Sequence, residues 1–538
     1  MRYLLIIFLL HTIIHAQYIS DVSYPDSTSK PVMDMSVTSV KLANEITPDD
    51  LRKHLSILAS DEFEGRGTGE PGNTKAAQYI KNHFMNLGLE PNNDLEEGYF
   101  QPIQFNYESW DEIKLTVNGQ KFRHLWDFLA FQDKNQDMDS LQIDKLYFMG
   151  YGIDDPAYSD YKGKNMAGKT ILIYDGEPTN TAGVSRITNS SSLSDWSTDP
   201  TKKLEAAAKY GVKTVLIISN DIKGMLGKNR RSLLGAKVTM GEIKNRPVYP
   251  NNIYVSTTIA EALMGNKKDK VIQSRERITE KGKLKRIKIK NNILLDMDKK
   301  TRKLAGQNVL GFIEGTDKKD EIVVLSAHYD HLGKKGESIY NGADDNGSGT
   351  TAVLEIADTF AKGLKDGKRP RRSVLFLLVT GEEKGLLGSA YYAKFPVYPL
   401  DETMVDINVD MVGRVDDKYQ SNPNYIYVIG SDRLSTDLHK INENINQTYT
   451  QLVMDYTYNS EEDPNRYYFR SDHYNFAKNG IPAIFFFNGT HADYHMISDT
   501  VDKINFDKMS EVTRHIFHLA WELANIDDRI IVDGEVKE

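Results

Sequence analysis

Five short apolar segments, most of them followed directly by acidic or histidine side chains, constrain the fold of this chain most. They are NVLGFIEG, EIVVLSAHYD, SVLFLLVTG, TMVDINVDMVG and PAIFFFNG, and helical segments such as GTTAVLEIADTFAKGL alternate with them. Near-continuous apolar strands are typical of sheets buried on both faces, and intervening helices indicate parallel connections. The sequence therefore predicts an α/β fold with a mostly parallel central sheet flanked by helices.

A second group of predicted strands, in the middle of the chain, interrupts this pattern. The segments LQIDKLYFMGYGI, KTILIYDG and TVLIISN predict short strands, with KKLEAAAKYG as a helix between the last two. A chain of 538 residues is also long enough for two or three domains. We predict a signal peptide at 1–16, a linker at 17–46, a main domain formed by 47–137 and 286–530, and a smaller β-rich α/β domain inserted at 138–285.

The first sixteen residues, MRYLLIIFLLHTIIHA, suggest export. One arginine precedes an apolar run that ends at a small residue, which fits a signal peptide cleaved after Ala16. A membrane anchor is the alternative, but spanning a bilayer takes about 20 apolar residues, and this run is shorter and contains two histidines. We expect a soluble, exported (periplasmic or extracellular) protein with no stable membrane insertion after signal removal.

Composition narrows the possible chemistry. The chain has no cysteine, so disulfides, thiolate metal sites and cysteine nucleophiles are excluded. Its net charge of −9 gives no general support for a nucleic-acid partner. The basic stretch 267–290 is a local exception, but RIKIK at its end alternates apolar and basic residues. That alternation predicts a half-buried strand rather than a polyanion site.

The polar residues that follow the apolar strands form the candidate site. His328 ends one strand, and Asp330, two residues on, can accept a hydrogen bond from its second ring nitrogen. Glu382 and Glu383 follow another strand, where two adjacent acids are costly without a compensating cation. Ligands of open α/β sheets bind at this carboxyl edge of the strands.

Two further strands supply the remaining candidates. Asp410 lies inside an apolar run, and the loop after PAIFFFNG contains His495. The turn GADDNGSG adds either Asp344 or Asp345. Two imidazoles and three carboxylates at one edge suit a pair of zinc ions, with one carboxylate shared, although cobalt or manganese would accept the same ligands.

Six sequence blocks carry a family resemblance: HYDHLG, GADDNGSG, GEEKGLLGS, NVDMVG, RSDHYNF and DYHMISDT, in this order. They resemble the zinc aminopeptidases of peptidase family M28, over most of 47–137 and 290–525. The insert, with GYGIDD, DYKGKNMAGKTILIYDGEP and AAAKYGVKTVLIIS, resembles a protease-associated domain. The resemblance implies a zinc exopeptidase fold.

The resemblance also implies a role for each metal ligand. His328 and Asp410 would hold one zinc ion, and Glu383 and His495 would hold the other. Asp345, the acid immediately before the asparagine of the glycine turn, would bridge the two ions.

Three other residues receive roles from the same resemblance. Glu382 would be the general base towards a metal-activated water, and Asp330 would orient His328. Tyr494 is similar to a tyrosine that steadies the oxyanion in some relatives. Ser471, Asp472 and His473 match a family block without an implied catalytic role.

The expected function is therefore that of a secreted dinuclear zinc aminopeptidase acting on peptides. A carboxypeptidase or dipeptidase on the same metal core is the first alternative. A glutaminyl cyclase and an inactive binding ectodomain are weaker ones, because the first uses a single zinc ion, the second has lost ligands, and here no ligand is missing. Oligomeric state and preferred side chain stay open.

Overall fold

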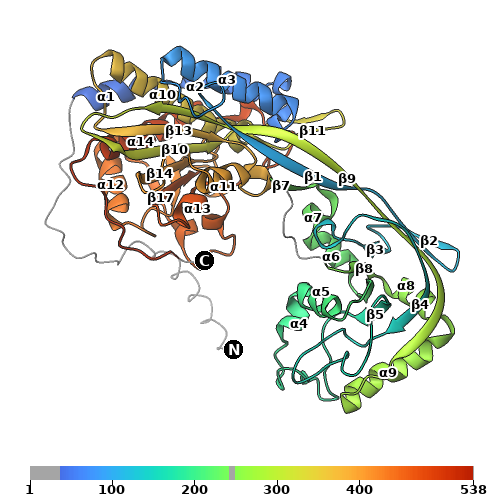
Figure 1. Cartoon of the computed structure of the whole chain (residues 1–538). Coiled ribbons are helices and arrows are strands. Elements are labelled where there is room, and N and C mark those ends of the chain that lie inside the picture. Colours follow the sequence, from blue (N-terminus) through green and yellow to red (C-terminus); the bar gives the residue numbers. More distant parts are fainter. Residues whose placement is uncertain (1–36, 242–248, 537–538) are drawn as a thin grey trace, which may run out of the picture.

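The chain forms two bodies joined by a pair of very long strands (Figure 1). This arrangement is seen in a computed structural model that describes residues 37–241 and 249–536. Strands β1 (Phe100–Val117) and β9 (Ile287–Ile313) pair antiparallel over the whole length of β1. The predicted signal peptide, residues 1–16, lies outside the described residues.

The larger body is built on a mostly parallel sheet, as predicted. Its strand order is β16-β15-β17-β14-β10-β13-β9. β10 pairs in parallel with β13 and β14, and β14 pairs in parallel with β17, whereas β9 and β15 pair antiparallel with their neighbours β13 and β17. The strands not yet bounded are β10 (Lys318–His328), β13 (Arg372–Val379), β14 (Thr403–Val409), β15 (Tyr425–Ile429), β16 (Val453–Asp455) and β17 (Ala483–Phe487).

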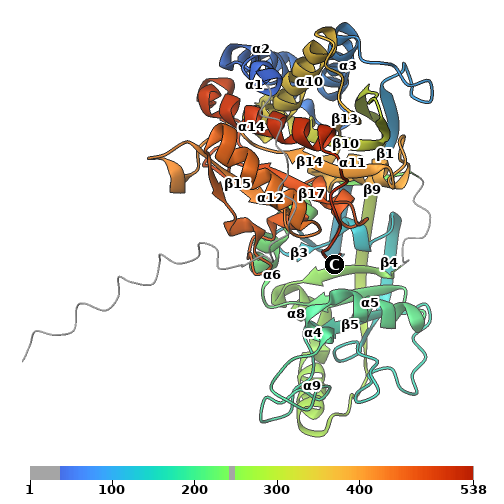
Figure 2. The same ribbon diagram turned by 90° about the vertical axis from the view of Figure 1, so that its left-hand side faces the viewer.

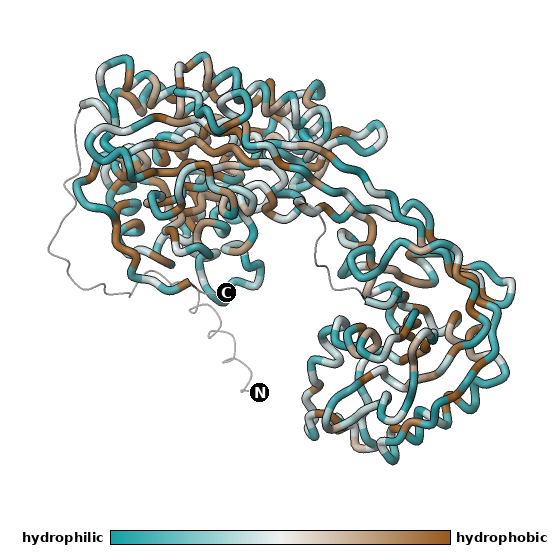
Figure 3. The backbone as a smooth tube through the Cα atoms, in the orientation of Figure 1, coloured by the Kyte–Doolittle hydropathy of each residue, from teal (hydrophilic) through white to brown (hydrophobic). Residues whose placement is uncertain are grey.

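Helices cover both faces of this sheet, because successive side chains of a strand point to opposite sides. In β10, Val323 and Leu325 pack in one core cluster, whereas Ile322 and Val324 pack in another. The first cluster lies under α1 (Val37–Ala43), α2 (Pro48–Leu58), α3 (Pro71–Leu87), α10 (Gly349–Lys365), α12 (Thr436–Ile445) and α14 (Phe506–Asn525). The second lies against α11 (Leu387–Lys394) and α13 (His473–Ala477). Figure 3 shows hydrophobic residues concentrated along the central strands.

The N-terminal helices begin and end at residues that suit helix caps. Thr47 caps α2 through its side chain, which accepts a hydrogen bond from the Asp50 N–H, and Pro48 is the first helical residue. α3 ends at Gly88, which adopts a left-handed conformation. The predicted linker at 17–46 needs a correction, because residues 37–43 form α1. That helix is retained by packing, since Leu42 and Ala43 are buried in the main core.

The inserted body has its own sheet and core, seen below the main body in Figure 2. Its strand order is β4-β5-β6-β8-β3, continuing from β9. Its strands are β2 (Gln120–Phe122), β3 (Phe128–Leu129), β4 (Met138–Phe148), β5 (Thr170–Tyr174), β6 (Thr214–Ile218) and β8 (Asn251–Val255). Strand β7 (Lys237–Met240) pairs with β1 and packs near α11 of the larger body. Its helices are α4 (Asp195–Thr198), α5 (Pro200–Lys209), α6 (Ile222–Lys228), α7 (Arg230–Leu234), α8 (Thr257–Met264) and α9 (Lys268–Lys281).

The predicted insert boundary at 138 is too late. Leu115, Val117 and Phe128, which the sequence assigns to the main domain, pack in the core of the insert with Ile253 and Ile289. The reason is that β1 and β9 run through both bodies. The prediction of a half-buried strand at the end of the basic stretch is confirmed, because the isoleucines at 287 and 289 are buried and the lysines at 288 and 290 are exposed. The resemblance of the insert to a protease-associated domain stays a prediction.

Within residues 37–241 and 249–536, no helix combines the length and apolar character needed to cross a membrane. A small hairpin, β11 (Gly333–Lys335) and β12 (Ser338–Tyr340), projects after β10.

A buried histidine of α14 should make the protein sensitive to acid. His515 is fully buried, with Nε2 2.9 Å from Asn442 Oδ1 and Nδ1 3.0 Å from Thr450 Oγ1. Burial lowers the pKa of His515 to about 3, below the value of about 6.5 for an exposed histidine. Because protonation then favours the unfolded chain, this stability is complete above about pH 6.5 and is lost as the pH falls.

Replacement of His515 by Gln, which can keep both hydrogen bonds, tests this prediction. Between pH 7.5 and pH 5, wild type should lose about 2 kcal/mol more unfolding free energy than H515Q, from about 1.4 kcal/mol for each unit below 6.5. Urea unfolding at a series of pH values measures both curves. Parallel curves would show that His515 does not titrate on unfolding.

Candidate metal centre

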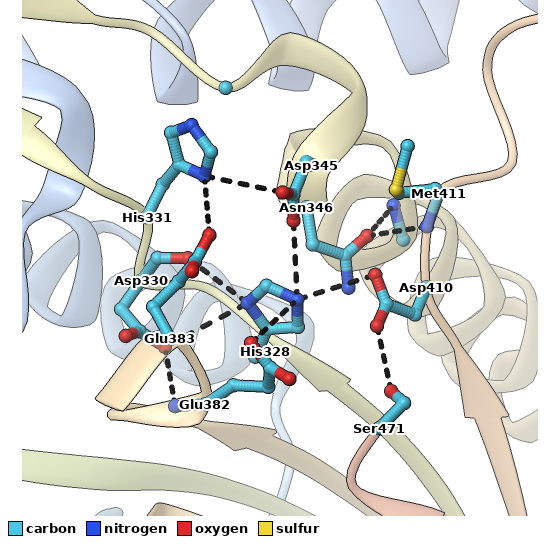
Figure 4. A network of polar contacts seen from close by, with 12 residues as sticks. His328, Asp330, His331, Asp345, Asn346, Glu382, Glu383, Asp410, Met411 and Ser471 are labelled. Carbon is cyan, nitrogen blue, oxygen red and sulfur yellow. Dashed lines mark hydrogen bonds and ion pairs between the residues drawn. The ribbon is translucent and has the colours of Figure 1, made fainter. Parts of the chain in front are cut away.

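The side chains predicted from the strand ends meet at one edge of the sheet (Figure 4). His328 is the last residue of β10, and Asp410 directly follows β14. Glu382 and Glu383 lie in a short helical turn after β13. His495 comes from the loop after β17. Parallel strands bring these loops together because their carboxyl ends share one edge.

Asp345 lies between two groups of these side chains. Its Oδ1 is 3.5 Å from His328 Nε2, and its Oδ2 is 3.0 Å from His495 Nε2. Its side chain is only 5% exposed. Each oxygen of Asp345 therefore faces a different imidazole, which is the arrangement expected of a carboxylate shared between two ions.

The first group surrounds His328. Its Nε2 lies 3.3 Å from Asp410 Oδ1 and 3.8 Å from Glu382 Oε2. Ser471 donates a hydrogen bond of 2.7 Å to the other oxygen of Asp410 and so fixes that carboxylate. His328, Glu382 and Asp410 offer donor atoms close enough together to hold one ion.

The second group surrounds Glu383 and includes a histidine that the sequence analysis did not select. Glu383 Oε1 lies 3.2 Å from His495 Nε2 and 3.0 Å from His331 Nδ1. His331 is completely buried and also lies 3.7 Å from Asp345 Oδ2. Its place in HYDH, three residues after His328, was the available signal, but a strand-end pattern does not reveal where the chain turns after β10.

Asp330 holds His328 through a different atom from the one expected. The Nδ1 atom of His328 lies 3.0 Å from the Asp330 backbone carbonyl, whereas the nearest carboxylate oxygen of Asp330 is 3.8 Å away. That carboxylate instead accepts hydrogen bonds from the Thr68 hydroxyl and from the Glu382 N–H. Asp330 therefore orients His328 with its main chain and positions Glu382 with its side chain.

Asp344, the other acid of the turn, has a structural role. It is fully buried and accepts hydrogen bonds from the Gly413 N–H, the Ser348 hydroxyl and the Asn488 amide. His491 Nε2 lies 3.1 Å from its second oxygen. These contacts tie the turn to the loops after β14 and β17.

The electrostatics of the site reflect many charges in a small buried volume. Burial raises the pKa of Glu382 well above its usual range. Burial alone would do the same for Glu383, but the neighbouring imidazoles of His331 and His495 hold its pKa well below the usual value. Burial would lower the pKa of His495, yet Asp345 and Glu383 raise it to about 9.

The donor set fits divalent metal ions such as zinc. Zinc binds imidazole nitrogen and carboxylate oxygen, and both are present in each group. Asp345 Oδ2 and His495 Nε2 are buried atoms without a hydrogen bond of good geometry, although they lie within 3.0 Å of each other. A metal ion requires donor atoms whose lone pairs point to one common position, and these two atoms fit that requirement.

A pocket opens beside the first group. Tyr494 stacks on His495 with ring centres 3.9 Å apart, and it lines this pocket together with Glu382. The other lining residues are His328, Asp345, Asp410, Met411, Tyr467, Arg470, Phe485, Phe487 and Thr490. The pocket therefore has a carboxylate end at the ligand cluster and an aromatic wall beyond it.

A buried arginine holds the metal-binding loops from outside the cluster. Arg66 is fully buried and donates hydrogen bonds of 2.6–2.8 Å to four carbonyl oxygens. They belong to Leu58, Tyr329, Asn341 and Gly342, so the side chain links α2 to the segments on either side of β11 and β12.

Replacement of Arg66 by Met should lower the unfolding free energy by about 3–5 kcal/mol, because buried partners would be left unpaired. Arg66→Lys keeps the charge but has fewer donors, placed differently. Its unfolding free energy should therefore lie between those of R66M and wild type. Urea unfolding of the three proteins, each loaded with zinc, measures the series. A loss below about 1 kcal/mol for R66M would contradict this role.

A mostly parallel α/β sheet with these donors at its carboxyl edge is the arrangement that the sequence analysis expects of a zinc exopeptidase. Residues 308–520, which include every proposed ligand, match the model of peptidase family M28.

Individual relatives agree with this assignment. A "Probable leucine aminopeptidase" of Arthroderma otae is 31% identical over 216 residues, which are 38% of this chain and 55% of that protein. A probable aminopeptidase of Saccharomyces cerevisiae is 28% identical over 40% of this chain and 56% of its own length. The chain thus spans little more than half the length of these relatives.

Solved structures share the fold along almost the whole chain. An aminopeptidase from Aneurinibacillus sp. strain AM-1 superposes with a TM-score of 0.56 at 20% identity, covering 93% of this chain and 100% of its own. A zinc aminopeptidase from Bacillus subtilis superposes with a TM-score of 0.50 at 19% identity, covering 91% of this chain and 99% of its own. At these identities the likeness shows the fold alone.

Proposed function

We propose that this protein is a dinuclear zinc aminopeptidase that removes residues from the N-termini of exported peptides. The observation that carries the proposal is the position of Asp345, whose two oxygens face two separate groups of donors. The match of residues 308–520 to peptidase family M28 supports the reaction class. The exported location rests on the sequence of residues 1–16 and is part of the proposal.

The proposed ligands follow from the two groups. His328 and Asp410 would hold one zinc ion, Glu383 and His495 would hold the other, and Asp345 would bridge them. His331 is a further donor candidate on the Glu383 side, because its Nδ1 is 3.0 Å from Glu383 Oε1. When bound, the zinc ions would act as Lewis acids that activate water and polarise the peptide carbonyl.

Glu382 would move the proton in this reaction. Its backbone N–H is anchored by the Asp330 carboxylate at 3.1 Å, and its side chain lines the pocket. A carboxylate here can accept a proton from the attacking water and return it to the leaving amine.

The pocket wall supports peptide binding. Tyr494 is placed to donate a hydrogen bond to an oxyanion beside the cluster, because burial and the neighbouring carboxylates raise its pKa and keep the phenol protonated. Phe485, Phe487 and Tyr467 give the far wall an aromatic surface suited to an apolar first side chain.

A substrate panel tests the proposal against a carboxypeptidase or dipeptidase on the same centre. Peptides with a free N-terminus and an amidated C-terminus should be cleaved, and the same peptides with an acetylated N-terminus should not. The bound zinc is counted on the same preparation. Cleavage of acetylated peptides that have a free C-terminus would replace the aminopeptidase assignment with a carboxypeptidase one.

A further inference from the structure

A second cluster of imidazoles and carboxylates lies in the outer helical layer. His54 comes from α2, His83 from α3, and Glu355 and Asp358 from α10. The two acids are three residues apart on one helix, so they share a face. Figure 1 shows these three helices side by side over the sheet.

The donor atoms of this cluster converge. His83 Nε2 is 2.6 Å from Asp358 Oδ2, and His54 Nε2 is 3.9 Å from the same oxygen. His54 Nε2 is also 3.4 Å from Glu355 Oε1. Donor atoms of His54, His83 and Asp358 all lie within 4.8 Å of one another, which is close enough for one ion to contact each.

The rings are held in orientations that suit a ligand. The second ring nitrogen of His54, Nδ1, lies 2.7 Å from the Tyr79 hydroxyl, so Nε2 is the atom directed at the acids. The two imidazole rings are 4.6 Å apart and almost perpendicular. Metal-binding histidines are typically oriented in this way through their second nitrogen.

Burial argues for a cation rather than for a solvated ion pair. The Glu355 side chain is 7% exposed and that of His54 is 13% exposed, whereas Asp358 is 37% exposed and leaves the cluster open on one side. Burial raises the pKa of Glu355 to about 8 and lowers that of His54 to about 4. The nearby ammonium group of Lys53 contacts Asp50 at 2.6 Å instead.

We propose that His54, His83 and Asp358 bind one structural transition-metal ion of the zinc class, with the Glu355 carboxylate beside His54. Two imidazole nitrogens and a carboxylate oxygen are ligands that zinc accepts, and the imidazoles argue against calcium or magnesium. The site is separate from the catalytic centre. α10 starts at Gly349, just after the turn of Asp345, and Asp358 lies about 14 Å farther along it at 1.5 Å per residue.

The ion would brace the helix that begins at the bridging ligand. α10 follows the turn that contains Asp345, and α2 and α3 flank the segment that contains Arg66. Cross-linking the three helices would therefore stabilise the frame around the catalytic loops without touching the substrate.

Metal counting on matched variants tests this site. Full-length wild type, H83N and H439N are loaded with zinc, passed over a desalting column and analysed by elemental mass spectrometry. H439N is the control, because it makes the same exchange at a histidine of α12 outside the cluster. H83N should hold one zinc fewer per chain than wild type, and H439N should hold the same number as wild type.

The difference between the proteins decides the result. Three zinc ions per chain in wild type and two in H83N would support both centres. Two in wild type and one in H83N would support the outer site and contradict a dinuclear catalytic centre. Equal zinc content in wild type and H83N would overturn the outer site. If H83N does not fold, D358N is used instead, because it keeps the size of the side chain. Its zinc content is then compared with that of wild type in the same way.

Discussion

Replacing Glu382 with Gln is expected to lower kcat by about 10²–10⁴-fold while the zinc content stays at the wild-type level. Glutamine has nearly the same shape but cannot accept the proton from water. Glu382 is also not among the proposed ligands, so the metal centre should be retained. Initial rates on a free-N-terminus peptide and zinc analysis of the same sample measure both quantities.

A second variant separates proton transfer from misplacement. Glu382→Asp keeps a carboxylate one methylene shorter, so it should retain more activity than E382Q while losing part of the wild-type rate. If E382Q works at close to the wild-type rate, Glu382 is not the base. If it loses zinc instead, the residue is a ligand, and the assignment of His328 and its neighbours must be revised.

Replacing Asp345 with Ala is expected to remove most of the bound zinc and, with it, peptidase activity. Asp345 contacts both donor groups, at 3.5 Å from His328 and 3.0 Å from His495, so its loss weakens both ions at once. Loss of an outer-shell partner costs about 10–100-fold in metal affinity, and the loss of a shared ligand should exceed that range. Zinc titration with a competing chelator measures the affinities.

The adjacent acid provides the matched control. Asp344→Asn changes the same turn and removes one charge, but the Gly413 and Ser348 contacts can be kept through the amide oxygen. D344N should retain its zinc with some loss of stability. Equal zinc affinity in D345A and wild type would show that Asp345 does not bridge the ions.

Most of the sheet could be predicted from the sequence, because burial on both faces gives β10, β13, β14 and β17 near-continuous apolar runs. The same logic located His328, Glu383 and Asp410, since their positions are fixed by where each strand ends, and it pointed to His495 in the loop after the last strand. The choice of Asp345 over Asp344 came instead from the family resemblance, because residues in a turn have no period that reports their direction.

What the sequence could not give depends on long-range contacts. Arg66 is a charged residue in an irregular segment, and only the folded chain brings four carbonyl oxygens around it. His331 faces Glu383 because the chain turns after β10, and no local pattern encodes that turn. The side chain of Asp330 is diverted from His328 by Thr68, which is 262 residues away in the sequence.

Strand β9 couples the two bodies mechanically, because it belongs to the sheets of both. Residues Val309–Ile313 pair with β13 at the edge of the catalytic sheet, and Ile287–Met297 pair with β4 in the insert. A domain on two flexible tethers could tumble freely, but here any tilt of the insert must bend or twist a hydrogen-bonded ribbon. Force applied to the insert would therefore be transmitted directly to the sheet of the larger body. The insert should move by elastic bending of the β1–β9 ribbon rather than by free rotation.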